Sequence, residues 1–354
     1  MKLTIKSKDN IQYLNNNYTL DKNKVNLNYA LIPLHNKLNN IKIKNYNYIR
    51  KSNINIIEEV STYFPNKIVD KINKTNYEEY TFKLKKNKYN FIIKLYSENT
   101  INIKNYILYI KLILLLFISY KPIDYNKYCS ITIYLTDFEK IINDIPVKPY
   151  NINSGFTYGN NIKIYRKEEW FKLFIHECIH LYEFDFHNYS DFSDMKKYFP
   201  IKSKFLLYEL YTEFWARIIN ISLLSLHKSF PIFKKRFHKY LKMEKLYSAV
   251  TANKILNINN LDYRGLLKPN TYNEETNVFC YYILSSLLFY YVNDTMYFFV
   301  SHNKNILDFN NKYVNSFKKY IIHLHKKEEW LTYLDNIKKY KTPNVNMALY
   351  EILF

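Results

Sequence analysis

The chain has 354 residues, of which 48 % are hydrophobic and 18 % aromatic, and it carries a formal net charge of +21. An apolar fraction of this size excludes a disordered chain and suffices for one large domain or two lobes. The charge permits contact with nucleic acid or another polyanion without establishing it, because the lysines are scattered along the sequence as on a solvated surface.

The first half of the chain predicts a small sheet. Residues 1–75 are rich in Asn and Lys and give little periodicity, apart from a helix expected near 54–63. Alternating apolar residues at 79–84 and 89–96 predict a hairpin, which is followed by a helix over 103–119 and a β-branched strand over 129–136. Two of the three glycines fall in 154–165, where we expect two short edge strands joined by a turn at Gly159 and a bulge or close backbone approach at Gly155.

The second half predicts mainly helices. Residues 251–273 contain Gly265 and Pro269 and are expected to be irregular. The expected helices cover 166–183, 205–226, 233–247, 275–300, 306–325 and 327–341. A hairpin, a helix, a strand and edge strands, followed by helices, together predict the α+β class.

The strongest local signal is His176-Glu177-Cys178-Ile179-His180, which lies in a stretch without Gly or Pro. Histidines at i and i+4 lie on one face of a helix and can reach a single metal ion. A buried Glu between two His would be costly without such a partner. Glu177 stands where it can take a proton from an activated water, so the pattern predicts a metal site with Glu177 as its catalytic base.

This H-E-x-x-H pattern resembles that of zinc metallopeptidases, and the order of elements is similar to the zincin fold. The resemblance implies a Zn²⁺ cofactor bound by His176 and His180. It also implies an upper lobe at 76–185, with a small mixed sheet, a backing helix and the active-site helix. A helical lower lobe at 186–354 would carry the third ligand, and 1–75 would be a separate basic segment. An extended polypeptide substrate would add to the edge strand near Phe156–Tyr165.

The families of zincins differ in the identity and the position of their third zinc ligand. The residues disfavour the metzincin pattern, because Glu183 replaces the glycine at which the helix would turn and Phe186 occupies the ligand position. A later stretch, Thr212-Glu213-Phe214-Trp215-Ala216, resembles the N/T-E-x-x-A pattern of gluzincins and the E-F-F-A segment of the anthrax lethal factor catalytic domain, which implies that Glu213 is the ligand. The alternative is Glu209, since Glu209-x-x-x-Glu213 approximates an E-x-x-x-D arrangement in which the first acid ligates and the second orients a histidine.

The family also implies a hydroxyl or imidazole donor for the oxyanion, and the expected donors are Tyr208 and Tyr211 beside the ligand helix. Metal-bound histidines usually donate to a carboxylate. The candidates for that role are Asp185, Asp191 and Asp194. His187 is expected to be a helix-end group or such a partner.

The three cysteines, Cys129, Cys178 and Cys280, form no C-x-x-C pair and predict free thiols in a reducing, intracellular compartment. The first ten residues lack an apolar core and predict no secretory signal. Apolar runs at 107–118 and 278–292 are shorter than the ~20 residues of a membrane span and are expected to be buried helices.

Together these features predict a zinc-dependent metallopeptidase. Two alternatives stay open: a catalytically inactive zincin-like protein with a structural or nucleic-acid-binding role, and a zinc hydrolase of non-peptide amides. The Asn-, Lys-, Ile- and Tyr-rich composition and the segment Arg166–Lys172 are similar to zincin-like proteins of large DNA viruses. That likeness implies a viral protein in the host cytoplasm or the virion.

Overall fold

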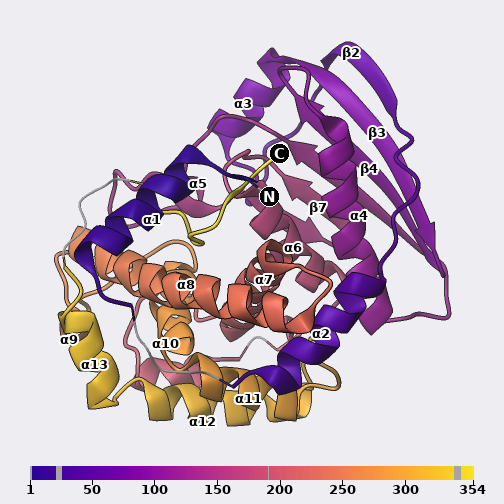
Figure 1. Ribbon diagram of the computed structural model, residues 1–354. Helices are drawn as coiled ribbons and strands as arrows, with labels where there is room; N and C mark the ends of the chain where they lie inside the picture. The colour runs from indigo at the N-terminus through magenta and orange to yellow at the C-terminus, as the bar shows by residue number, and fades with distance from the viewer. Residues whose placement is uncertain (1, 21–25, 190, 339–343) are drawn as a thin grey trace.

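The computed structural model describes residues 2–20, 26–189, 191–338 and 344–354. It has the predicted α+β class, with a six-stranded mixed sheet on one side and most of the helices on the other (Figure 1). The strand order is β2-β3-β4-β5-β7-β6. The strands are β2 (Ile49–Asn55), β3 (Asn76–Lys86), β4 (Tyr89–Ser97), β5 (Lys127–Tyr134), β6 (Gly155–Tyr158) and β7 (Asn161–Ile164).

Strand pairing confirms the predicted hairpin and edge strands. β3 and β4 pair antiparallel, and β4, β5 and β7 run parallel to one another. β6 lies at the edge of the sheet and pairs antiparallel with β7. Gly159 makes the turn before β7 with φ at +56°. A Cβ at Gly155 would lie 2.6 Å from the Lys163 carbonyl oxygen and 3.1 Å from Leu173 Cδ2. This glycine therefore lets the edge strand lie close to its own neighbours.

Two helices cover one face of the sheet, α4 (Ile103–Tyr120) and α6 (Trp170–Leu181). Both are apolar on most sides because both are buried on most sides. α4 has the length and composition of a membrane span, yet 67 % of it is buried inside the protein, as in a core helix. The opposite face packs on α3 (Asn66–Lys74) through an aromatic cluster around Phe64 and Tyr134.

The N-terminal residues wrap the rest of the molecule. α1 (Ile5–Asn17) and α2 (Asn28–Asn40) pack against α8, and β1 (Lys2–Leu3) pairs with β8 (Ile352–Leu353), which brings the two ends of the chain together. The helix expected near 54–63 was wrong, because β2 runs to Asn55 and an irregular stretch then leads to α3. Pro65 caps α3 in an extended conformation, so the helix begins only after it.

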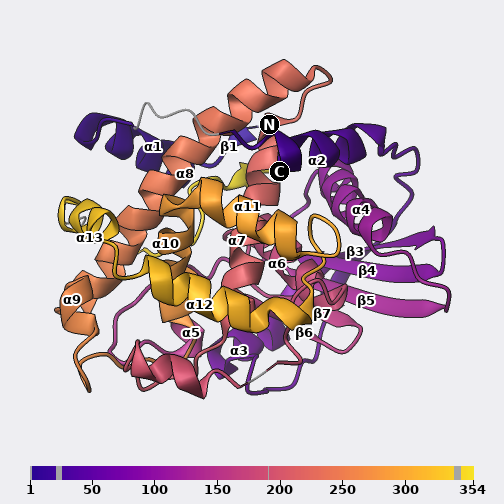
Figure 2. The ribbon, with the colours of Figure 1, turned by 90° about the horizontal axis from the view of Figure 1, so that it is seen from below.

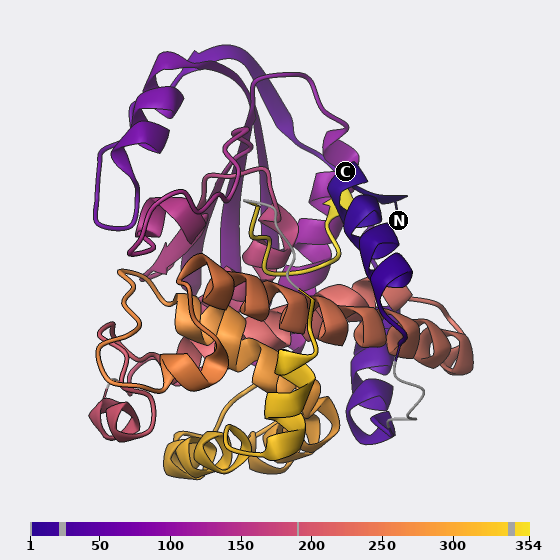
Figure 3. The same cartoon turned by 90° about the vertical axis from the view of Figure 1, so that its left-hand side faces the viewer.

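The second half is helical, as predicted, with shifted boundaries. α7 lies between α6 and α8, and the later helices pack on the side of α8 away from the sheet (Figures 2 and 3). α8 continues through residues expected to be irregular, and the helix expected over 275–300 is broken by a π-helical segment. The helices are α5 (Pro149–Ile152), α7 (Leu207–Ser225), α8 (Phe230–Ile258), α9 (Tyr263–Leu266), η2 (Phe279–Leu284, the π segment), α10 (Ser285–Tyr290), α11 (Val292–His302), α12 (Val314–Leu324) and α13 (Glu328–Asp335), with short 3₁₀ turns η1 (Ser193–Lys197) and η3 (Asn311–Tyr313).

Candidate metal centre

The centre is built on α6, whose C-terminus makes a sharp turn. Glu183 adopts a left-handed conformation with φ at +53°, and the Phe184 amide donates to the Ile179 carbonyl at 3.0 Å. The expectation that the helix could not turn without a glycine here was therefore wrong. The turn brings Asp185 back to the imidazole of His180.

Two rows of side chains, each spaced by four residues, face each other between α6 and α7. Lys172, His176 and His180 form the row on α6, and Glu209 and Glu213 form the row on α7. Glu209 lies beside both histidines, whereas Glu213 lies beside His176 and Lys172. The helices therefore run antiparallel, and their register decides which carboxylate meets which histidine.

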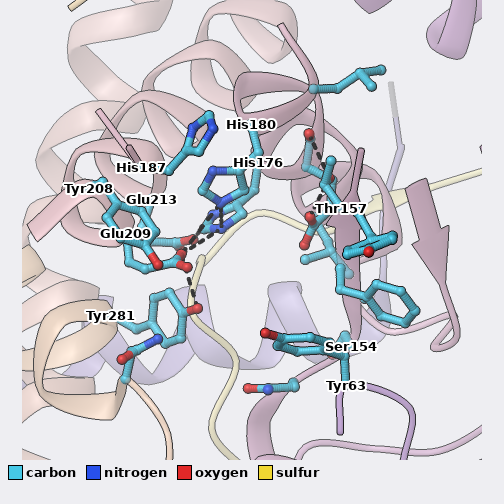
Figure 4. Close-up of a pocket in the computed structure, with 18 of the residues that line it drawn as sticks. Tyr63, Ser154, Thr157, His176, His180, His187, Tyr208, Glu209, Glu213 and Tyr281 are labelled. Carbon is cyan, nitrogen blue, oxygen red and sulfur yellow. Dashed lines mark hydrogen bonds and ion pairs between the residues drawn. The ribbon is translucent and has the colours of Figure 1, made fainter. Parts of the chain in front are cut away.

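Three ligand atoms converge between these rows (Figure 4). The Nε2 atoms of His176 and His180 are 3.2 Å apart, and the Oε2 atom of Glu209 lies 3.2 Å from the first and 3.5 Å from the second. Zinc ligands at roughly 2.0–2.2 Å in a tetrahedron are about 3.3–3.5 Å from each other. The triangle is thus of the size that one divalent cation requires.

The outer nitrogens of both imidazoles are held by carboxylates. His180 Nδ1 donates to Asp185, which also accepts from His187 Nδ1 at 2.6 Å and from Thr212 Oγ1 at 3.2 Å. His176 Nδ1 donates to Glu213 Oε2 at 3.2 Å. These contacts place the Nε2 atoms of both rings beside each other and beside Glu209 Oε2, so three potential ligand atoms meet at one point. Such an arrangement could hold one metal ion.

The geometry favours Glu209 over the predicted Glu213 as the third ligand. Its side chain is fully buried and accepts two hydrogen bonds from Lys172 Nζ, at 3.0 and 2.9 Å. It contacts the nitrogen of His176 that points away from the ligand triangle. Glu209 rather than Glu213 therefore lies with the two histidines in the group that could hold a metal ion, as in the alternative E-x-x-x-D arrangement.

Charge and burial shape the protonation of these groups. Burial by itself would lower the pKa of His176, but the hydrogen bonds of this histidine to Glu209 and Glu213 raise it above its usual value. Burial by itself would raise the pKa of Glu213. The charge of Lys172 and the hydrogen bond from His176 instead lower it to about 2. Glu213 is therefore ionised and acts as an acceptor for His176.

Glu177 lies in the same cavity and is held from the edge strand. Its Oε2 atom accepts a hydrogen bond from Thr157 Oγ1 at 2.8 Å, and the same hydroxyl lies 3.0 Å from the Glu177 carbonyl oxygen. Burial raises the pKa of the Glu177 carboxyl. The side chain is thus fixed and disposed to take up a proton.

The two tyrosines predicted as donors differ in their surroundings. Tyr211 is wrong as a donor, because it is fully buried, does not line the cavity and donates to the Leu307 carbonyl at 2.6 Å. Tyr208 lines the cavity with its ring 6.1 Å from that of His180. A third tyrosine, Tyr281, also lines the cavity, and its hydroxyl donates to Glu209 Oε2 at 3.1 Å (Figure 4).

Sequence reasoning missed Tyr281, Lys172 and Thr157. Tyr281 comes from the π-helical segment η2, and such segments are frequent at functional sites. No sequence signal marked it among 38 tyrosines. Lys172 did carry a signal, since it precedes His176 by four residues on the same helical face.

Of the other candidate partners, Asp185 is confirmed in contact with His180, and His187 joins it. Asp194 and the carbonyl of Asp191 instead contact Lys318, away from the centre. The three cysteines are free and buried, as predicted.

The cavity has a volume of about 480 Å³ and opens along the edge strand. Gly155–Tyr158 of β6 forms one wall, and Tyr63 and Ser154 lie across from the histidines (Figure 4). Because β6 pairs in the sheet only with β7, one side of its backbone is free within the described residues. That side can accept an extended chain.

One cavity therefore contains three potential ligand atoms for a metal ion, a buried carboxyl group and a tyrosine hydroxyl. Comparison of the chain with protein-family models, curated proteins and solved structures found no match.

Proposed function

We propose that the protein is a zinc-dependent hydrolase that cleaves peptide bonds, with His176, His180 and Glu209 holding the metal. The observation that carries the proposal is the convergence of three acceptor atoms, 3.2–3.5 Å apart, beside a carboxyl group in the same cavity. Two imidazoles and one carboxylate form the donor set of many catalytic zinc sites, which keep a fourth position for water.

A zinc ion held there would lower the pKa of a water molecule and polarise a carbonyl oxygen. Glu177 accepts the proton of the attacking water and delivers it to the departing amine nitrogen. Thr157 keeps the carboxylate of Glu177 oriented for both transfers through its hydrogen bond. Tyr281 is the hydroxyl donor nearest the ligand triangle, and we assign it to the oxygen that becomes negative as the bond is attacked.

A peptide is favoured over a small amide by the wall of the cavity. The free edge of β6 borders the site along four residues, and the backbone of an extended peptide can pair with it. The pairing would place the substrate chain alongside Glu177, because Thr157 of this same strand holds that carboxylate.

The decisive variant is Glu177→Gln, which keeps the shape of the side chain and removes its ability to take a proton. We expect about one equivalent of zinc in both the wild-type and the variant protein, because Glu177 is not a ligand. Hydrolysis of a mixed peptide library, followed by mass spectrometry, should fall by about 10²–10⁴-fold.

The matched control is Glu59→Gln, the same change at an exposed position on the sheet side of the molecule. It should leave both zinc content and hydrolysis unchanged. Zinc binding with no hydrolysis by the wild-type protein would support a structural role for the metal. Equal hydrolysis by wild type and Glu177→Gln would overturn the proposed mechanism.

A further inference from the structure

A pair of hollows lies apart from the candidate metal centre, where residues 41–48 run beside α4. Figure 1 shows this extended segment running between α2 and β2 along the α4 side of the sheet. The first hollow has a volume of about 440 Å³ and the second about 770 Å³, and both are bordered by Lys44. Neither shares a lining residue with the cavity of the metal centre. We call the two together the lysine groove.

The lysine groove is lined by cations without acids. Six lysines border it, and no Asp or Glu does among the described residues. None of the six makes an ion pair with a described carboxylate. The lysines are Lys37, Lys42, Lys44, Lys86, Lys104 and Lys111.

One of these lysines, Lys111, is buried, and another, Lys37, is half-buried. Lys111 is only 4 % exposed and donates to the Asn45 carbonyl at 2.8 Å. Lys37 donates to the Ser119 carbonyl at 2.7 Å, and its ammonium group lies 4.3 Å from the centre of the Tyr120 ring. Burial lowers the pKa of both lysines. Placing ammonium groups together in a hollow without a counter-charge is costly, and a bound anion would offset that cost.

The remaining lining suits a chain with flat apolar groups. Ile41, Ile43 and Leu84 form part of the floor of the first hollow. Tyr46 and Tyr48 line the second, where Tyr48 is 40 % exposed. Basic grooves with accessible aromatic rings bind single-stranded nucleic acid, because lysines follow the phosphates while bases stack on the rings. A hollowed surface of this kind fits a strand better than the flat face of a membrane.

We propose that the lysine groove binds single-stranded nucleic acid, independently of the metal centre. The phosphates lie along the lysines of both hollows, and a base stacks on Tyr48. The segment 41–48 provides a continuous path between the hollows because Lys44 borders each of them.

The test uses the full-length protein and a short fluorescent oligonucleotide, with anisotropy measured at increasing salt. The variant Lys42→Gln/Lys44→Gln/Lys86→Gln/Lys104→Gln changes four exposed lysines of the groove. Each lost phosphate contact reduces the slope of log affinity against log salt by about 0.7 for a single strand, so the slope should fall by about 3. Tyr48→Ser should weaken binding on the order of tenfold with little change in the slope.

The matched control changes four exposed lysines elsewhere, Lys196, Lys197, Lys235 and Lys239, to Gln and so removes the same net charge. It should bind almost as wild type does. Equal weakening in both quadruple variants would overturn the proposal, because net charge alone would then explain binding. Tighter binding of a duplex than of the strand, or groove-dependent binding of phosphatidylserine vesicles without strand binding, would overturn it as well.

DNA and RNA strands of the same sequence form the two arms of the assay, and binding of either supports the proposal. Glu177→Gln should bind the strand as wild type does, so the failure of one proposal leaves the other standing.

Discussion

The metal centre and the lysine groove are both hollows lined by charged side chains, but their charges are balanced in opposite ways. At the centre, Glu177, Asp185, Glu209 and Glu213 surround two histidines, with Lys172 as the ammonium group in direct contact. In the groove, six lysines have no carboxylate beside them among the described residues. Each hollow therefore favours a ligand of the charge that it lacks.

This comparison shows that the sign of the uncompensated charge in a hollow says more about its ligand than the net charge of the protein does. The value of +21 describes the whole surface, where most lysines face water. A buried or concave group cannot rely on water in that way, so its partner must come from the protein or from a ligand. The carboxylates of the centre therefore favour a bound cation, and the ammonium groups of the groove favour a bound anion.

The largest effect that we expect separates the two carboxylates of α7. Glu209→Ala should abolish zinc binding and reduce hydrolysis by more than about a thousandfold, because the site loses one of three ligands. Glu213→Gln should retain zinc with about 10–100-fold lower affinity, because it alters only a partner of His176. Competition with a chromogenic chelator measures both affinities.

A Glu213 variant without zinc, alongside a Glu209 variant that binds it normally, would reverse the assignment. Hydrolysis alone could not make this distinction, so metal affinity is the necessary measurement.

A smaller effect compares a paired buried lysine with an unpaired one. Lys172→Met should destabilise the protein by about 3–5 kcal/mol, because it leaves the fully buried Glu213 without its cation. Lys111→Met should change the free energy of unfolding by less than about 1 kcal/mol or stabilise the protein, because no carboxylate is abandoned. Urea unfolding of the metal-free proteins measures both.

The double variant Lys172→Met/Glu213→Gln is the control for the paired site, and it should recover most of the lost stability. Equal losses from Lys172→Met and Lys111→Met would contradict the contrast between the two regions.

The smallest effect concerns a buried base, His325, that forms no ion pair with a described carboxylate. His325 is fully buried against Phe199, and neither ring nitrogen has a hydrogen-bond partner among the residues that the structure describes. Burial lowers its pKa from 6.5 to about 4. The unfolded chain binds the extra proton between these two values, so stability should be complete above pH 6.5 and fall as the pH drops toward 4.

His325→Phe should remove on the order of 2 kcal/mol of that pH dependence, which thermal melts across the range would reveal. An unchanged pH profile in the variant would show that other groups cause the acid sensitivity.

Much of the fold followed from local pattern. We could predict β3 and β4 from their alternation and α4 and α6 from their apolar surfaces, because each pattern reflects the burial of a single element. The N-terminal helices and the extent of α8 were not predicted, because they are polar or mixed in sequence and are stabilised by distant partners.

The sequence by itself determined the four-residue spacing of His176 and His180, and of Glu209 and Glu213, because helical geometry places such pairs on one face. Only the tertiary structure decided that Glu209 joins the histidines while Glu213 pairs with Lys172, because the register of α6 against α7 depends on packing along both helices. The same holds for Tyr281 and for the lysine groove. Their side chains come from segments far apart in the chain, and no local spacing brings them together.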